Sequence, residues 1–225
     1  MPKRLILASA SPRRRDLLCL LGLPFEVIAS EVSEEIPEEM RVPFSIVERL
    51  ALAKADDVTS RIYSQAILDQ SALRGLDTCV IGCDTIVALE HLEPPAILGK
   101  PADSDDARTM LKRLSGGIHC VYTGVALVRQ WWDPKAEEYE LKRTVESVQT
   151  EVHFRSLSTE IIDWYISTGE PFDKAGAYGI QGHASVLVYS VDGDYFNVVG
   201  LPVATVARML EDIGIEWWKG AAALE

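Results

Sequence analysis

"LASASPRRRDLL" (residues 7–18) has the pattern of a strand that turns directly into a helix. The apolar run at 4–8 predicts the strand, while Ser11 and Pro12 predict the helix start, because serine caps helices and proline suits the first helical position. The next residues, Arg13–Arg15, place positive charge at the positive end of the helix dipole. Each such charge costs a few tenths of a kcal/mol, so this turn needs an explanation beyond helix formation.

Two explanations of the arginines remain open. An anion bound against the free N–H groups and the guanidinium groups would make the charges favourable, and a strand followed by a helix N-terminus is a common phosphate-binding geometry. Alternatively, the turn is solvated and its arginines reach back to nearby glutamates such as Glu31 and Glu34. The first explanation predicts a phosphate site, and the second predicts ion pairs on the surface.

The rest of the chain alternates apolar runs with helical patterns. Further strands are predicted at 25–29, 79–89, 119–128, 148–154 and 185–191. Helical patterns lie at about 11–21, 44–58, 103–115, 158–167 and 202–213. Because strands and helices interleave and the later strands differ in pattern, we expect an α/β fold with a mixed, twisted sheet and flanking helices. The segments 59–77 and 129–143 are predicted to be solvent-facing insertions.

The composition is typical of a globular protein in the cytoplasm. A net charge of −12 opposes binding to DNA or RNA, since attraction to phosphates supplies most non-specific affinity. No apolar run reaches the roughly 18 residues of a membrane span, so we expect no membrane association. The four cysteines form no C-x-x-C pair and are predicted to be reduced and mostly buried. The ending "AAALE" (221–225) resembles the remnant of an expression tag.

Two charged residues stand in apolar surroundings. Asp84 carries the only charge in "CVIGCDTIVAL" (79–89), and a buried carboxylate is costly without a cation, a metal or hydrogen bonds. It is either a metal ligand or a base that activates water, or it caps a turn at the end of a strand. Lys54 in "LALAKA" (50–55) either faces a site or extends its ammonium group to solvent.

Other charges lie in loops at the ends of these elements. Glu34 follows a predicted strand, where a solvated acidic loop is the alternative, and Lys100 stands between a glycine and a proline. Asp173 and Lys174 lie in the glycine-rich segment 169–182, which is predicted to be a flexible loop near a ligand. Cations among carboxylates suit a polyphosphate with Mg²⁺ or Mn²⁺, because cations hold phosphate oxygens and oxygen ligands hold the metal. These residues do not say which bond breaks.

Eight motifs in matching order resemble the Maf family of nucleoside triphosphate pyrophosphatases along almost the whole chain. They are "LASASPRR" (7–14), "SEVSEE" (30–35), "LALAKA" (50–55), "GCDTIV" (82–87), "GKP" (99–101), "SGGIHCVYTGV" (115–125), "DKAGAYGIQG" (173–182) and "GDYFNVVGLP" (193–202). The resemblance implies a fold like that of the inosine triphosphate pyrophosphatases, with one domain over 1–220 and two lobes around a deep cleft. It also implies a homodimer.

The same resemblance implies hydrolysis of a nucleoside triphosphate to the monophosphate and pyrophosphate, with Mg²⁺ or Mn²⁺. Asp84 would accept the proton of the water that attacks the α-phosphorus, and Glu34 and Lys54 would complete the catalytic group. The phosphates would be held by Ser9, Arg13, Arg14, Lys54 and Lys100. Asp84 and Glu34 would hold the metal, and Asp173 and Lys174 are additional residues of the cleft.

Three positions separate the branches of the family, and here they are Arg13, Thr85 and Gln181. This set resembles the branch that prefers pyrimidine triphosphates (dTTP, UTP or modified uridines) over the branch that prefers 7-methyl-GTP. An amide such as that of Gln181 can donate to and accept from a uracil edge. Cys83 stands where the family usually has alanine, and we expect it to shift Asp84 slightly or to expose a thiol to oxidation.

A nucleotide-binding regulator without turnover, linked to cell division and septum formation, is the alternative function. The carboxylate of Asp84 favours catalysis, because a protein that only binds nucleotide does not need a negative charge facing the phosphates.

Overall fold

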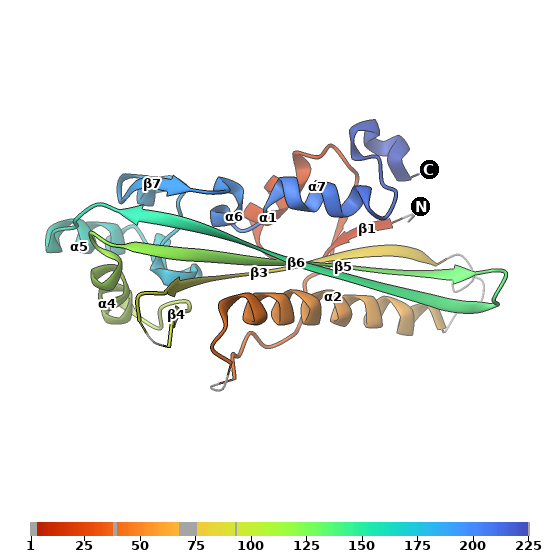
Figure 1. The fold of residues 1–225 in the computed structure, drawn as a ribbon, viewed down its shortest axis with the longest axis horizontal. Coiled ribbons are helices and arrows are strands. Elements are labelled where there is room, and N and C mark those ends of the chain that lie inside the picture. The colour runs from red at the N-terminus through yellow and green to blue at the C-terminus, as the bar shows by residue number, and fades with distance from the viewer. Residues whose placement is uncertain (1–3, 38–39, 68–75, 93, 225) are drawn as a thin grey trace.

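The computed structural model describes residues 4–37, 40–67, 76–92 and 94–224. Its framework is a seven-stranded sheet in the order β2-β1-β3-β5-β6-β7, with β4 paired to β3 (Figure 1). The strands are β1 (Arg4–Leu7), β2 (Glu26–Val27), β3 (Asp77–Leu89), β4 (Ala96–Leu98), β5 (Ile118–Asp133), β6 (Glu138–Phe154) and β7 (Val188–Asp192). β1 runs parallel to β2 and β3, and the other pairs are antiparallel. The predicted α/β fold with a mixed sheet is confirmed.

Helices flank both faces of the sheet. They are α1 (Pro12–Cys19), α2 (Pro43–Ile67), α4 (Ser104–Leu114), α5 (Thr159–Ser167), α6 (Tyr195–Val199) and α7 (Val203–Glu211). α2 lies along one face, α1, α6 and α7 lie on the other, and α4 and α5 lie at the end of the molecule away from both termini (Figure 1). None of the helices in the described part of the chain is long and apolar enough to cross a membrane.

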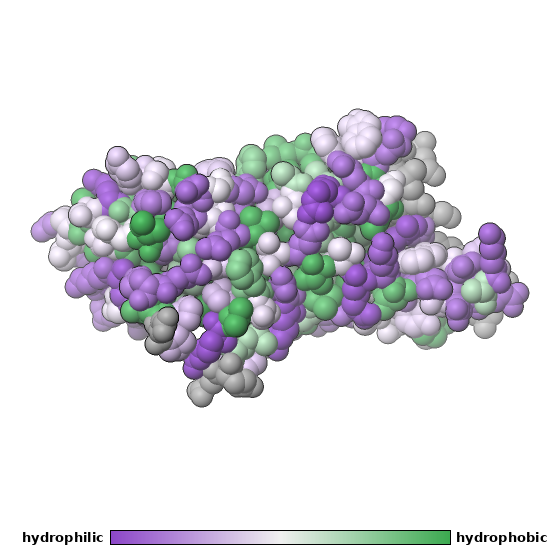
Figure 2. All heavy atoms as spheres, in the orientation of Figure 1, coloured by the Kyte–Doolittle hydropathy of each residue, from purple (hydrophilic) through white to green (hydrophobic). Residues whose placement is uncertain are grey.

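Alternating side chains of β1 supply two separate cores. Ile6 belongs to a buried cluster with Ala51 of α2, whereas Leu5 and Leu7 belong to the larger cluster on the other face, which includes Leu18 of α1. The view in Figure 2 shows hydrophilic residues spread over this face of the surface, with smaller hydrophobic areas between them. The sheet is therefore covered on both faces, which leaves its strand edges as places where a ligand can reach it.

One such edge lies in the middle of β3. β1 pairs with β3 only over 78–81, and β4 pairs with it only over 87–89. Within the described residues, no strand covers the edge of β3 between these two segments, at 82–86. Asp84 and Thr85 lie in this gap, on opposite faces of the sheet, because successive side chains of a strand alternate.

Two glycines allow α2 to lie directly on the sheet beside this gap. A Cβ atom at Gly82 would collide with the carbonyl oxygen of Ala51, and one at Gly124 would collide with that of Val47. The register pairs Gly124 with Asp84, so both glycines and Asp84 share the face that α2 covers. This close packing brings Lys54, one helical turn beyond Ala51, to the carboxylate of Asp84.

The prediction of an insertion at 59–77 is wrong for the part that the structure describes. α2 continues to Ile67, with Thr59, Ile62 and Ala66 buried. These residues repeat at intervals of three and four and extend the buried stripe that begins at Pro43, so the helix buries one face along its whole length. Residues 68–75 lie outside the described part of the chain, and Asp77 already begins β3.

The segment 129–143 is not a loop but the far end of a strand hairpin, and almost all of it is exposed or half-buried, in agreement with the predicted solvent-facing position. β5 and β6 pair without interruption to Asp133 and Glu138, and four residues join the strands. Asp133 accepts a hydrogen bond from the backbone N–H of Lys135 at 2.8 Å, as in an Asx turn. Among the shorter elements, the expected strand at 25–29 has only two residues, and β4 and α6 were not predicted.

Candidate active site

One cavity of 640 Å³ collects every residue that was predicted for the site. Its lining includes Ser9, Arg13, Arg14, Glu34, Lys54, Asp84, Thr85, Lys100, Asp173, Lys174 and Gln181. The volume lies within the range of small-molecule sites, which is about 300–1,000 Å³. The cavity opens at the uncovered edge of β3, so both faces of the sheet contribute side chains to it.

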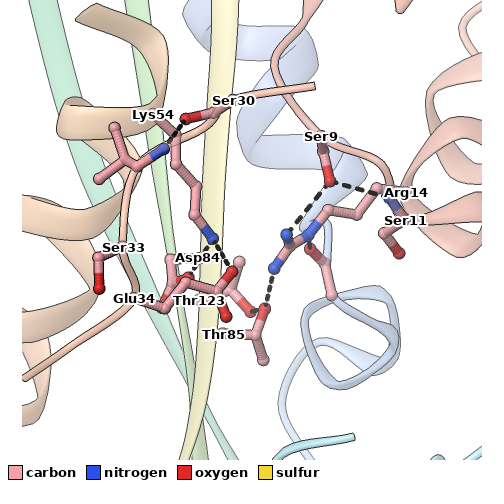
Figure 3. Close-up of polar contacts among 12 residues, drawn as sticks. Ser9, Ser11, Arg14, Ser30, Ser33, Glu34, Lys54, Asp84, Thr85 and Thr123 are labelled. Atoms are coloured by element: carbon pink, nitrogen blue, oxygen red, sulfur yellow. Dashed lines mark hydrogen bonds and ion pairs between the residues drawn. The ribbon is translucent and has the colours of Figure 1, made fainter. Parts of the chain in front are cut away.

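Lys54 joins the two central carboxylates. Its Nζ lies 2.6 Å from Asp84 Oδ1 and 2.6 Å from Glu34 Oε1 (Figure 3). Lys54 and Asp84 are each 6% exposed, so Lys54 does not extend to solvent, and Asp84 lies inside β3 rather than at its end. The alternatives of a solvated lysine and of a turn-capping aspartate are therefore wrong.

Lys100 extends this group toward solvent. Its Nζ donates to Glu34 Oε2 at 2.9 Å, so Glu34 lies between two ammonium groups. Burial alone would raise the pKa of Glu34, but the hydrogen bonds from Lys54 and Lys100 outweigh it and lower the pKa to about 2. Glu34 is therefore ionised at neutral pH. Because both of its carboxylate oxygens accept hydrogen bonds from lysines of the site, the alternative of a merely solvated acidic loop is wrong for Glu34.

Arg14 belongs to a second group on the other face of β3. Its Nη2 donates to Thr85 Oγ1 at 2.9 Å, its Nε donates to the carbonyl oxygen of Gly200 at 2.8 Å, and its Nη1 lies 3.4 Å from Ser9 Oγ (Figure 3). These bonds hold the turn after β1 against the segment between α6 and α7. The guanidinium is thus oriented before any ligand arrives.

Arg13 forms a third group with the glycine-rich segment. Its Nη1 lies 3.2 Å from Asp173 Oδ2, and Lys174 donates to the other oxygen of the same carboxylate. Burial opposes ionisation of Asp173, but Lys174 and Arg13 together lower its pKa. Arg13 and Arg14 do not reach back to Glu31 or Glu34, so that explanation is wrong for these two residues, whereas Arg15 is exposed and pairs with Asp16 on the surface.

The glycine-rich segment is not an open loop. It folds as short 3₁₀ turns at 170–173, 175–177 and 182–186, and Gln181 lies between the last two. Tyr178, which sequence reasoning missed, also lines the cavity, and its hydroxyl lies 2.7 Å from Nε2 of the buried His119. The sequence did hold a signal for Tyr178, namely an aromatic residue between two glycines. The glycines let the backbone pass close to Lys174, whose side chain would collide with a Cβ at Gly179.

Cys83 does not expose a thiol to the site. Its side chain is fully buried in the cluster on the face opposite Asp84, and burial raises the pKa of the thiol to about 11. All four cysteines are free, and three of them are buried, as predicted. The expectation of an oxidisable thiol at the site is therefore wrong.

The donor set fits a hard divalent cation that is shared with substrate. The described residues hold no cluster of three or more histidine, cysteine or acidic side chains with metal-binding geometry. Glu34 and Asp84 nevertheless present carboxylate oxygens to one point, the Nζ of Lys54. Mg²⁺ is typically held by one or two carboxylates, with phosphates and water completing the shell, and Glu34 and Asp84 are ligands of this kind.

Comparisons with known proteins give matches to one family over almost the whole length of the chain. The sequence model of the Maf-like protein family matches residues 4–213. A dTTP/UTP pyrophosphatase of Alkaliphilus oremlandii is 47% identical over 93% of this chain and 96% of its own length. Proteins of the same description from Symbiobacterium thermophilum and Bacillus cereus are 46% and 44% identical, covering 98% and 95% of this chain and 99% and 97% of their own lengths. The chain therefore belongs to the Maf family.

Proposed function

We propose that the protein is a nucleoside triphosphate pyrophosphatase that converts dTTP, UTP or a related pyrimidine triphosphate to the monophosphate and pyrophosphate. The observation that carries the proposal is the buried contact between Lys54 and Asp84 at the uncovered edge of β3. A carboxylate in this position, among cations and inside a cavity of nucleotide size, is suited to accept a proton beside a polyphosphate. The names of the relatives support the same reaction.

In the proposed reaction, Asp84 accepts a proton from a water molecule. Lys54 bonds to one oxygen of Asp84 and holds the carboxylate in place, so that the other oxygen faces the water. The oxygen of that water forms a bond to the α-phosphorus while the bond from the α-phosphorus to the bridging oxygen breaks. Pyrophosphate leaves with the electron pair, and the catalytic contribution is mainly positioning and charge stabilisation.

The cations are placed to offset the charge of the phosphates. Lys100 is more than half exposed and Arg13 is partly exposed, so both can change partners from a carboxylate to a phosphate oxygen. Glu34 and Asp84 would hold Mg²⁺ or Mn²⁺, which supplies positive charge opposite the phosphate oxygens. Arg14 and Ser9 would bind from the opposite wall of the cavity.

The pyrimidine preference is assigned to Arg13, Thr85 and Gln181. All three line the same cavity as the catalytic group, from three separate segments of the chain. The homodimer and the cytoplasmic location are further parts of the proposal, and light scattering and cell fractionation test them.

Product analysis tests the reaction. The protein is incubated with Mg²⁺ or Mn²⁺ and dTTP, UTP, CTP, GTP or 7-methyl-GTP, next to an Asp84→Asn variant. We expect monophosphate and pyrophosphate from dTTP and UTP, and at least a hundredfold slower turnover in the variant, in the range of a lost general base. Orthophosphate as the product would refute the bond assignment, and nucleotide binding without turnover would favour the regulator.

A further inference from the structure

A chain of hydroxyl groups runs from the cavity wall into the interior behind Thr85. Thr85 of β3 and Thr123 of β5 are direct cross-strand partners, so both side chains lie on one face of the sheet. Their Oγ1 atoms are 2.9 Å apart (Figure 3). Thr123 is fully buried, whereas Thr85 is half-buried and lines the cavity. The chain thus connects a buried residue with the ligand space.

Only one arrangement of the hydroxyl protons allows all the hydrogen bonds in this row to form. Thr123 Oγ1 lies 3.0 Å from the carbonyl oxygen of Asn197, and a carbonyl can only accept, so Thr123 donates its single hydroxyl proton there. Thr85 must then donate its own proton to Thr123. Thr85 also accepts from Arg14 Nη2, because a guanidinium can only donate. The lone pair that remains on Thr85 Oγ1 can therefore only accept a hydrogen bond from a molecule in the cavity.

The acceptor at the end of the chain is held firmly. Asn197 is fully buried, and its Nδ2 donates to the carbonyl oxygen of Val121 at 3.0 Å and to Thr150 Oγ1 at 2.9 Å. These bonds join α6 to the two neighbouring strands β5 and β6, so the carbonyl of Asn197 cannot turn away from Thr123 without breaking buried hydrogen bonds. The fold therefore fixes which group donates in each hydrogen bond of this row, from Thr85 to Thr123 and from Thr123 to Asn197.

We propose that Thr123 is a positioning residue that fixes Thr85 as a hydrogen-bond acceptor for the N3–H group of uracil or thymine. The proposal rests on the proposed function and extends it to the atom of the base that is read. Uracil and thymine carry a proton on N3, whereas cytosine has a lone pair there. A hydroxyl that can only accept binds the first two bases and repels the third. Thr123 acts through Thr85 and does not touch the substrate.

Thr123→Val tests this directly, because it keeps the branched shape and removes the hydroxyl group. The proton of Thr85 then loses its buried acceptor and is free to turn toward N3 of cytosine. We expect the ratio of kcat/KM for UTP to kcat/KM for CTP to fall about tenfold, mainly through a lower KM for CTP. Thr123→Ser should restore the ratio of the wild-type protein.

Thr78→Val is the matched control. Thr78 is a fully buried threonine of β3, the strand that also carries Thr85; it does not line the cavity, and its Oγ1 has no hydrogen-bond partner among the described residues. Its replacement should leave the UTP to CTP ratio unchanged. A ratio that is unchanged in Thr123→Val, or one that Thr123→Ser fails to restore, would overturn the proposal.

Two further measurements keep the test decisive. Thr85→Val removes the acceptor itself, so a full preference for UTP in that variant would overturn the proposal even if Thr123→Val does not fold. Calorimetric titration with the α,β-methylene analogues of UTP and CTP measures the same preference as binding. If the wild-type protein forms no UMP, the proposed function fails, and an analogue binding ratio that falls about tenfold in Thr123→Val still supports the role of Thr123.

Discussion

Replacing Lys54 by methionine should leave a buried carboxylate without its cation. Lys54 and Asp84 are each 6% exposed, and their charged atoms lie 2.6 Å apart. Methionine has a similar shape but carries no charge, so the variant isolates the loss of the cation. Removing one partner of a buried ion pair costs about 3–5 kcal/mol, and we expect the free energy of unfolding at pH 7 to fall by about 3 kcal/mol.

The expected change in melting temperature follows from the size of the chain. At about 2.1 cal/mol/K for each of the 225 residues, the entropy of unfolding is about 0.47 kcal/mol/K. A loss of about 3 kcal/mol therefore lowers Tm by about 6 °C. Calorimetry measures this change in Tm. A chelator is added because a bound divalent cation would replace the missing ammonium group.

The double variant Lys54→Met, Asp84→Asn is the control, because it removes both charges. It should recover most of the lost stability, since no buried charge is left without a partner. A single variant as stable as the wild-type protein, or a double variant less stable than the single one, would refute the reasoning.

Three further changes test other parts of the account. Gly124→Ala should lower the free energy of unfolding by about 3 kcal/mol, because the new methyl group would meet the carbonyl oxygen of Val47. Gly99→Ala is the control, since the added methyl group there has open space and should change the free energy of unfolding little. Urea denaturation measures both variants. Glu34→Gln should cost about 1 kcal/mol at pH 7, allowing for solvent screening of a half-exposed side chain. Because the folded pKa of Glu34 is about 2 and lies below the unfolded value, this contribution is complete above about pH 5 and is lost as the pH falls toward 2; an equal cost at pH 3 and pH 7 would contradict it. Of the four cysteines only Cys19 is exposed, so a thiol reagent should label one cysteine in the folded chain and four after denaturation, and rapid labelling of more would disagree with the fold.

Elements with a clear apolar period could be predicted from the sequence. β3 has a continuous buried run, and its predicted range differs from the observed one by two residues at one end. The end of α2 was missed because exposed polar side chains such as Ser64 hide the buried stripe that continues through Ile62. The far arm of the β5–β6 hairpin was missed because strand pairing depends on a partner, and consecutive exposed residues such as Leu141, Lys142 and Arg143 do not show the alternation of a half-buried strand.

The charged members of the site could be predicted from the positions of their charges, whereas Ser9 and Thr85 were predicted only by the family resemblance. Asp84 and Lys54 each stood out against a hydrophobic background. The hydrogen-bond partners of the site residues could not be predicted in this way. Arg14, for example, donates to Gly200, which lies far along the sequence, and only the fold brings the two residues together. Thr123 escaped notice because a buried neutral hydroxyl group leaves no charge anomaly in a strand where threonine is common.

Hydrolysis in water labelled with oxygen-18 tests the central claim most directly, namely that Asp84 directs water to the α-phosphorus. The reaction with UTP or dTTP is stopped after a single turnover, and mass spectrometry locates the label in the products. The account predicts one labelled oxygen in the nucleoside monophosphate and none in pyrophosphate. Label in pyrophosphate or in orthophosphate would place the attack on another phosphorus and would contradict the mechanism.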